Sequence, residues 1–174
     1  MANWLAARER RHRAQVYLQR LLIAPDASDI AWLGAIVGDR DVAERELIFA
    51  RRALGLIVAE RDALDDRTAA DVAHALTAVI EAEARRSAAV ARHWIERRRA
   101  YTAAMAVRGQ SAAPAARFGR VLLEGAGVAH PSDDALARAE HFVQVTRTQA
   151  NEALRAVFGV ASMPEDVRPS AIRP

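Results

Sequence analysis

The chain has 174 residues, of which 52% are apolar and 27% charged, a balance typical of one soluble globular domain. It contains no cysteine, which excludes disulfides, thiolate metal sites and cysteine nucleophiles. All 25 basic residues are arginine, so lysine-based catalysis is excluded, and the net charge is only +3. Abundant alanine and few aromatic residues favour helix over sheet, so we expect an all-α protein.

Charge is unevenly distributed along the chain. The net charge is +4 over residues 1–24, −5 over residues 25–66, +4 over residues 67–108 and zero over residues 109–174. Basic and acidic segments that alternate in this way can pair between helices of one chain or between chains. We therefore expect a homo-oligomer and a protein partner.

The first two predicted helices are bounded by simple signals. Apolar residues recur at helical spacing over residues 3–23, and Pro25 ends this first helix. Ser28 can cap a short second helix, which Gly38 stops.

The third predicted helix begins near residues 39–41 and runs to about residue 64. Asp41 and Glu44 have the spacing of a capping box. Phe49 and Leu56 project from the face opposite the main apolar stripe. A helix that is apolar on two sides lies in the centre of a bundle or at a subunit interface.

The fourth predicted helix is very long, covering residues 68–108. Thr68 and Asp71 form a capping signal, and no glycine or proline follows until Gly109. Such a helix would be about 60 Å long at 1.5 Å per residue. We therefore expect an elongated hairpin or a dimer.

The rest of the chain predicts two more helices and a tail. A short helix runs to about residue 124, and a last helix runs from Ser132 to about Phe158, where Gly159 caps it. The fold prediction is an elongated antiparallel bundle of about four main helices plus one or two short ones. Residues 1–159 form a single domain, and the Pro-containing residues 160–174 form an extended or disordered tail.

An apolar stripe with an arginine in it predicts a contact surface. In the segment around Arg97–Arg99 the three arginines point in three directions, since successive helical residues are about 100° apart. Arg98 falls on the stripe between two aromatic residues. The predicted core or interface anchors are Phe49, Leu56, Trp94, Arg98, Tyr101 and Met105.

A basic row on the same long helix suggests nucleic-acid binding as an alternative. Arg85, Arg92 and Arg99 are spaced by seven residues and would share one face. Glu81 and Glu96 interrupt this row. Nucleic acid is therefore a partner that the sequence allows but does not favour.

Glu83 is an acidic residue inside the apolar stripe of the long helix. Its structural interpretation is a buried carboxylate that pairs with an arginine and sets the helix register. Its functional interpretation is an acid, base or ligand-binding group with a raised pKa. The structural interpretation is favoured.

No constellation in the sequence indicates catalysis, a metal or a cofactor. The spacing Glu-x-x-His, which a di-metal bundle needs on two helices, occurs once, at Glu9 and His12. Phosphate-binding glycine loops and nucleophile elbows do not occur. We therefore predict no catalytic residue, no metal site and no cofactor.

The function that these features favour is a non-catalytic helical scaffold, adaptor or accessory subunit of a larger bacterial assembly. The alternatives are a nucleic-acid-binding or regulatory protein, and a bundle that binds a small ligand or a metal. No apolar run is long enough for a membrane span, and no signal peptide is evident. We therefore expect a cytoplasmic protein.

Overall fold

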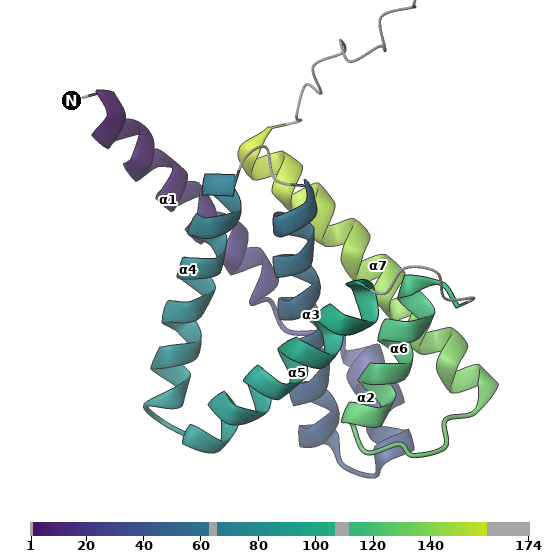
Figure 1. Cartoon of the computed structure of the whole chain (residues 1–174). Coiled ribbons are helices and arrows are strands. Elements are labelled where there is room, and N and C mark those ends of the chain that lie inside the picture. The colour runs from purple at the N-terminus through teal and green to yellow at the C-terminus, as the bar shows by residue number, and fades with distance from the viewer. Residues whose placement is uncertain (1, 63–65, 107–111, 160–174) are drawn as a thin grey trace, which may run out of the picture.

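The computed structural model describes residues 2–62, 66–106 and 112–159, and this part of the chain is all-helical, as predicted (Figure 1). It contains seven helices and no strand within those ranges. The helices are α1 (Ala2–Leu21), α2 (Ala27–Val37), α3 (Arg40–Asp62), α4 (Asp66–Ala84), α5 (Ala88–Ala106), α6 (Pro114–Gly125) and α7 (Asp133–Phe158). The predicted tail, residues 160–174, lies outside the described ranges.

Helix α3 is the centre of the fold. It contacts each of the other six helices, and the ribbon view shows it running through the middle of the molecule (Figure 1). Its residues from Ala53 to Ala59 are all buried. The two apolar faces predicted for this segment are thus both covered, and the covering helices belong to the same chain.

Several helix ends follow the local signals in the sequence. Gly38 ends α2 with a φ of 76°, which favours glycine, and donates its N–H to the Gly34 carbonyl. The Ser132 hydroxyl accepts a hydrogen bond from the Ala135 N–H at the start of α7. Gly159 ends α7 with a φ of 88°.

Three predicted caps are wrong in their position. Ser28 lies inside α2, whose N-cap position is Asp26. Asp39, and not Asp41, accepts the first backbone N–H groups of α3, with distances of 2.9 Å to the Asp41 nitrogen and 3.1 Å to the Val42 nitrogen. Helix α4 already includes Asp66, so Thr68 lies inside the helix and not at its cap. The Thr68 side chain is buried there.

The single long helix predicted over residues 68–108 is also wrong. The segment forms two helices, α4 and α5, joined by a turn at residues 85–87 (Figure 1). In that turn the N–H groups of Arg86 and Ser87 both donate to the Glu83 carbonyl at 2.9 Å. The expectation of about four main helices fails for the same reason.

The turn lets both halves of this segment pack on α3. A 23-residue α3 is only about 35 Å long, so a straight helix of about 60 Å would overrun it. With the turn, Val72 and Leu76 of α4 and Trp94 of α5 are all buried. Ser87 assists the turn, because serine competes for backbone hydrogen bonds and weakens a helix interior.

Two glycines permit close helix packing. A Cβ on Gly55 would lie 2.4 Å from the Leu21 Cδ atoms, so α1 packs directly on the α3 backbone there. Beside this contact the Tyr17 hydroxyl donates to the Gly55 carbonyl at 2.9 Å. A Cβ on Gly119 of α6 would lie 2.9 Å from the Glu140 nitrogen of α7.

None of the described helices combines the length and the apolar content that crossing a bilayer requires.

Candidate functional site

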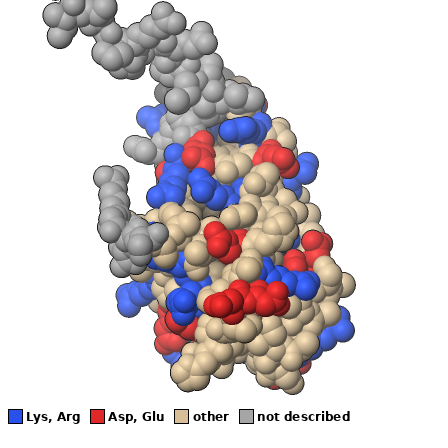
Figure 2. Space-filling view, turned by 90° about the vertical axis from the view of Figure 1, so that its right-hand side faces the viewer, with Lys and Arg blue, Asp and Glu red and all other residues tan. Residues whose placement is uncertain are grey.

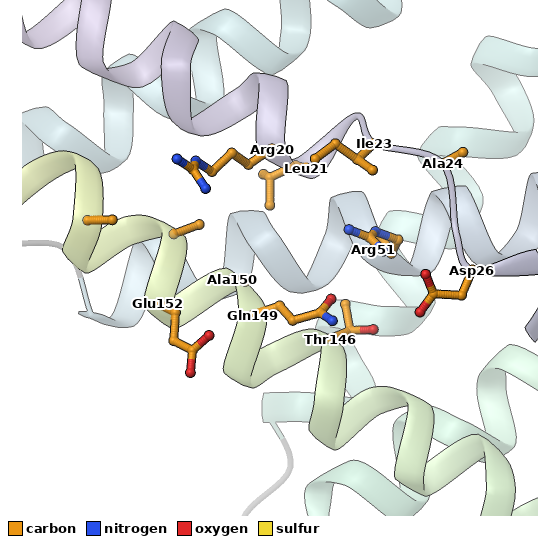
Figure 3. Close-up of a pocket in the computed structure, with 12 residues that line it drawn as sticks. Arg20, Leu21, Ile23, Ala24, Asp26, Arg51, Thr146, Gln149, Ala150 and Glu152 are labelled. Carbon is orange, nitrogen blue, oxygen red and sulfur yellow. The ribbon is translucent and has the colours of Figure 1, made fainter.

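A groove lies between α7 and the segment that joins α1 to α2, with Arg51 of α3 between them (Figure 3). It consists of two adjoining hollows of about 430 and 550 Å³. Both hollows are lined by Asp26, Arg51, Thr146 and Gln149, so they adjoin one another. Cavities of this size accept small molecules.

Arg51 has no direct partner for its charge. It is half-buried, its Nε atom is buried without a hydrogen-bond partner, and none of the described ion pairs includes it. Burial lowers the pKa of Arg51, while the nearby carboxylates of Asp26 and Asp29 act in the opposite direction. The guanidinium thus lies near the carboxylates of Asp26 and Asp29 but forms no ion pair with either of them.

Asp29 experiences the same incomplete neutralisation. Burial raises the pKa of its carboxyl, and the charge of Asp26 raises it further. Arg138, His141 and Arg51 act to lower the pKa of Asp29, but the net direction is upward. The groove therefore holds charged groups of both signs, which act on one another electrostatically without forming ion pairs.

The two ends of the groove differ in character. One hollow is largely apolar, with Leu21, Ile23, Ala150 and Ala153 along its walls. The other is polar, and its lining includes Arg138, which donates to the Ser28 carbonyl at 3.4 Å and lies 5.2 Å from the Trp32 ring centroid. Arg51 lies where the two hollows meet.

The outer face of α5 forms a separate hollow, of about 540 Å³. Ile95 lies there, in the middle of the helix, and is 53% exposed. Arg98, Arg99, Thr102 and Ala103 surround it, next to the edge of Trp94. This α5 outer face, defined by Ile95, Arg98, Arg99, Thr102 and Ala103, combines apolar surface with positive charge.

The anchors predicted from the sequence lie mostly in the core of the single chain. The ring centroid of Phe49 lies 5.7 Å from that of Trp94, and Tyr101 stacks on Phe118 with centroids 4.3 Å apart. Five of the six predicted anchors are buried within the chain: Phe49, Leu56, Trp94, Tyr101 and Met105. Their burial needs no second chain.

Arg98 is the exception among the predicted anchors. Its side chain is 46% exposed and lies 3.8 Å from the Glu60 carboxylate of α3. It is therefore beside the buried stripe and on the outer face of α5, and an exposed ion pair of this kind contributes little to stability.

The basic row predicted for nucleic acid is not continuous. Arg85 lies in the turn between α4 and α5, whereas Arg92 and Arg99 lie on α5. All three are exposed. Arg85 therefore does not continue the face that Arg92 and Arg99 share, because the helix is broken at residues 85–87.

Charge on the side where α6 and α7 lie is also mixed. Figure 2 shows acidic and basic side chains next to one another on that side, between wide uncharged areas. A phosphate backbone favours a row of positive charge, and this face does not offer one.

Glu83 pairs with an arginine of another helix. Arg52 of α3 donates two hydrogen bonds to its carboxylate, both at 2.8 Å, and the two side chains are 9% and 25% exposed. These hydrogen bonds lower the pKa of Glu83. The carboxylate is thus held ionised by its partner, and this contact attaches the end of α4 to the middle of α3.

A buried acidic residue that the sequence patterns did not indicate is Glu46, which is 2% exposed on α3. The Tyr101 hydroxyl donates to its carboxylate, and the Arg97 Nε atom lies 3.1 Å from the same oxygen, although the geometry of that ion pair is not that of a hydrogen bond. His93 lies 3.7 Å from the other oxygen. We call Glu46, His93, Arg97 and Tyr101 the Glu46 cluster.

The Glu46 carboxylate at the centre of the cluster is buried, although the His93 side chain beside it is 37% exposed. Burial raises the pKa of Glu46 despite its partners, and burial and Glu46 together raise the pKa of Tyr101. A Cβ on Gly125 would lie 2.3 Å from an Arg97 nitrogen and 2.5 Å from a Glu46 oxygen, so α6 covers the cluster tightly. The sequence signal was Glu46 itself, which shares the apolar face of α3 with Ala43 and Ala50.

No group of three or more histidine, aspartate or glutamate side chains in the described ranges could hold a metal ion. Two open surfaces therefore stand out, the groove at Arg51 and the α5 outer face. No family model, curated protein or solved structure matches the chain.

Proposed function

We propose that the chain is a non-catalytic helical adaptor or accessory subunit, which binds a protein partner through the α5 outer face. In this proposal it belongs to a larger bacterial assembly in the cytoplasm. The observation that carries the proposal is Ile95, more than half exposed and bordered by Arg98 and Arg99 around a hollow. Large apolar side chains at a concave surface mark contact sites.

The chemistry of this face indicates the kind of partner. Apart from Glu60, which lies against Arg98, the charges bordering the hollow are positive. A partner surface with an apolar side chain for the hollow and carboxylates for Arg98 and Arg99 would be complementary. We therefore expect an acidic, amphipathic protein segment, and a second copy of this chain is the alternative occupant.

Partner binding can be tested by replacing Ile95 with Asp. The tagged full-length chain is purified from its native host, and co-purifying proteins are compared between the wild type and Ile95→Asp. A matched control is Ile36→Asp, since Ile36 is 39% exposed on α2 and lies away from α5. The expected result is a partner lost with Ile95→Asp and retained with Ile36→Asp.

Light scattering of the purified proteins separates the two occupants. A dimer that Ile95→Asp converts to a monomer identifies a second copy of this chain. A wild-type monomer with unchanged co-purifying proteins in both variants would show that the α5 outer face is not the contact surface.

A further inference from the structure

We propose that the groove at Arg51 binds a small zwitterion with an apolar side chain, such as an apolar α-amino acid. This site is separate from the α5 outer face and does not depend on it. Arg51 would hold the carboxylate, Asp26 and Asp29 would hold the ammonium group, and the apolar hollow would take the side chain.

This inference rests on charged groups at the centre of the groove that form no ion pair with one another. Arg51, Asp26 and Asp29 are close enough to influence one another, but the described structure contains no ion pair between Arg51 and either aspartate. A partly buried charge without a direct partner is costly. A ligand that carries an ammonium and a carboxylate group on one carbon atom would satisfy the arginine and the aspartates together.

The charge balance of the groove favours a ligand with no net charge over a strongly anionic or a strongly cationic one. Three arginines line it, together with four acidic residues, and one histidine stands at the polar end. The arginines are Arg20, Arg51 and Arg138, and the acids are Asp26, Asp29, Asp134 and Glu152. A phosphate group would meet the acids, and a polyamine would meet the arginines, whereas a zwitterion finds partners for both its ends.

The walls beside Arg51 suit an aliphatic side chain. Leu21, Ile23, Ala150 and Ala153 form the apolar hollow of about 430 Å³ next to the arginine. Thr146 and Gln149 lie at the junction of the two hollows and provide uncharged hydrogen-bonding groups there (Figure 3). An apolar body with a few well-placed polar contacts is the usual pattern of a small-molecule site.

The test is titration calorimetry of the full chain with L-leucine and two analogues that each lack one charge. Isocaproate lacks the ammonium group, and isoamylamine lacks the carboxylate. We expect leucine to bind and each analogue to bind at least about tenfold more weakly, because a charged hydrogen-bonding group is then left unpaired. Equal binding of leucine and either analogue, or no heat with leucine at millimolar concentration, would overturn the zwitterion site.

Variants locate the binding within the groove. Arg51→Met and Asp29→Asn should each weaken leucine binding at least about tenfold. Arg61→Met, an arginine on α3 outside the groove, is the matched control and should leave the affinity unchanged. Circular dichroism checks that each variant is folded, and Arg51→Lys, which keeps the charge but loses the planar fork, should show a smaller loss if Arg51→Met does not fold. Leucine binding that Arg51→Met and Arg51→Lys leave unchanged would contradict the assignment.

Discussion

Arg51 and Arg52 are neighbours on α3, yet they lie in opposite surroundings. Arg52 is buried and donates two hydrogen bonds to the Glu83 carboxylate, both at 2.8 Å. Arg51 is half-buried in a groove, and no described ion pair includes it. Consecutive helical residues point about 100° apart. The same helix therefore holds Arg52 in a buried ion pair and places Arg51 in the groove.

The comparison extends to the whole of α3. On the closed side, Arg52 with Glu83 and the Glu46 cluster connect α3 to α4 and α5. On the open side, Arg51 faces a cavity. Buried charges with partners hold helices in position, whereas a charge without a partner at a cavity is available for a ligand. Stability measurements should separate the two sides.

The largest effect is expected on the closed side, at Glu46. Replacing it with Leu leaves the buried Tyr101 hydroxyl without its acceptor and the Arg97 guanidinium without its ion-pair partner. We expect the free energy of unfolding, measured by urea denaturation, to fall by about 3 kcal/mol. Glu44→Leu, at a half-buried position on the same helix, should change it by less than about 1 kcal/mol. A small effect at Glu46 would mean that the cluster does not hold α5 in place.

Removing Arg52 should have the next largest effect. Arg52→Met keeps the length of the side chain but leaves the Glu83 carboxylate unpaired. The expected loss in unfolding free energy is about 2 kcal/mol, less than at Glu46 because Glu83 is 25% exposed and can be hydrated. Thermal and urea unfolding would both show the loss, and an unchanged stability would contradict the closed contact.

The Arg52–Glu83 contact also predicts a pH dependence. Its hydrogen bonds lower the pKa of Glu83 from 4.5, so its stabilising contribution is present above pH 4.5 and is lost as the pH falls through the lower, folded-state pKa. Glu83→Gln should therefore destabilise the protein by about 1.5 kcal/mol at pH 7 and by progressively less at acid pH. Urea denaturation of both proteins between neutral and acid pH measures this difference, and a constant difference would exclude the ionised pair.

The smallest effect is expected on the open side. Arg51→Met removes a half-buried charge that has no direct partner, so the unfolding free energy should change by less than about 1 kcal/mol. The contrast with Arg52→Met is the direct test of the comparison, because the substitution is identical and the positions are adjacent. A loss at Arg51 as large as at Arg52 would mean that Arg51 pairs with Asp26 or Asp29 in solution.

Local signals in the sequence predicted much of the helical structure. Gly38 and Gly159 end helices through positive φ angles, and Ser132 caps a helix through a side chain three residues away, so neighbouring residues suffice to predict them. The two apolar faces of α3 could also be read from helical periodicity. The break between α4 and α5 could not, because residues 85–87 contain neither glycine nor proline, and packing on α3 decides it.

The candidate sites were harder to predict than the helices. Glu83 was noticed because it interrupts an apolar stripe, which is a pattern within one helix. The groove at Arg51 joins residues 20–29, residue 51 and residues 134–156, and no local pattern connects these three segments. Ile95 was missed because its exposure depends on which face of α5 the other helices cover.

The central position of α3 has a consequence for how the protein unfolds. Every other helix contacts α3, so none of them keeps its full set of neighbours once α3 is lost. The chain is therefore expected to unfold in one cooperative step, with the amide hydrogens of α3 exchanging most slowly of all. A proteolytic fragment that lacks α3 would lose the one helix that all the others contact.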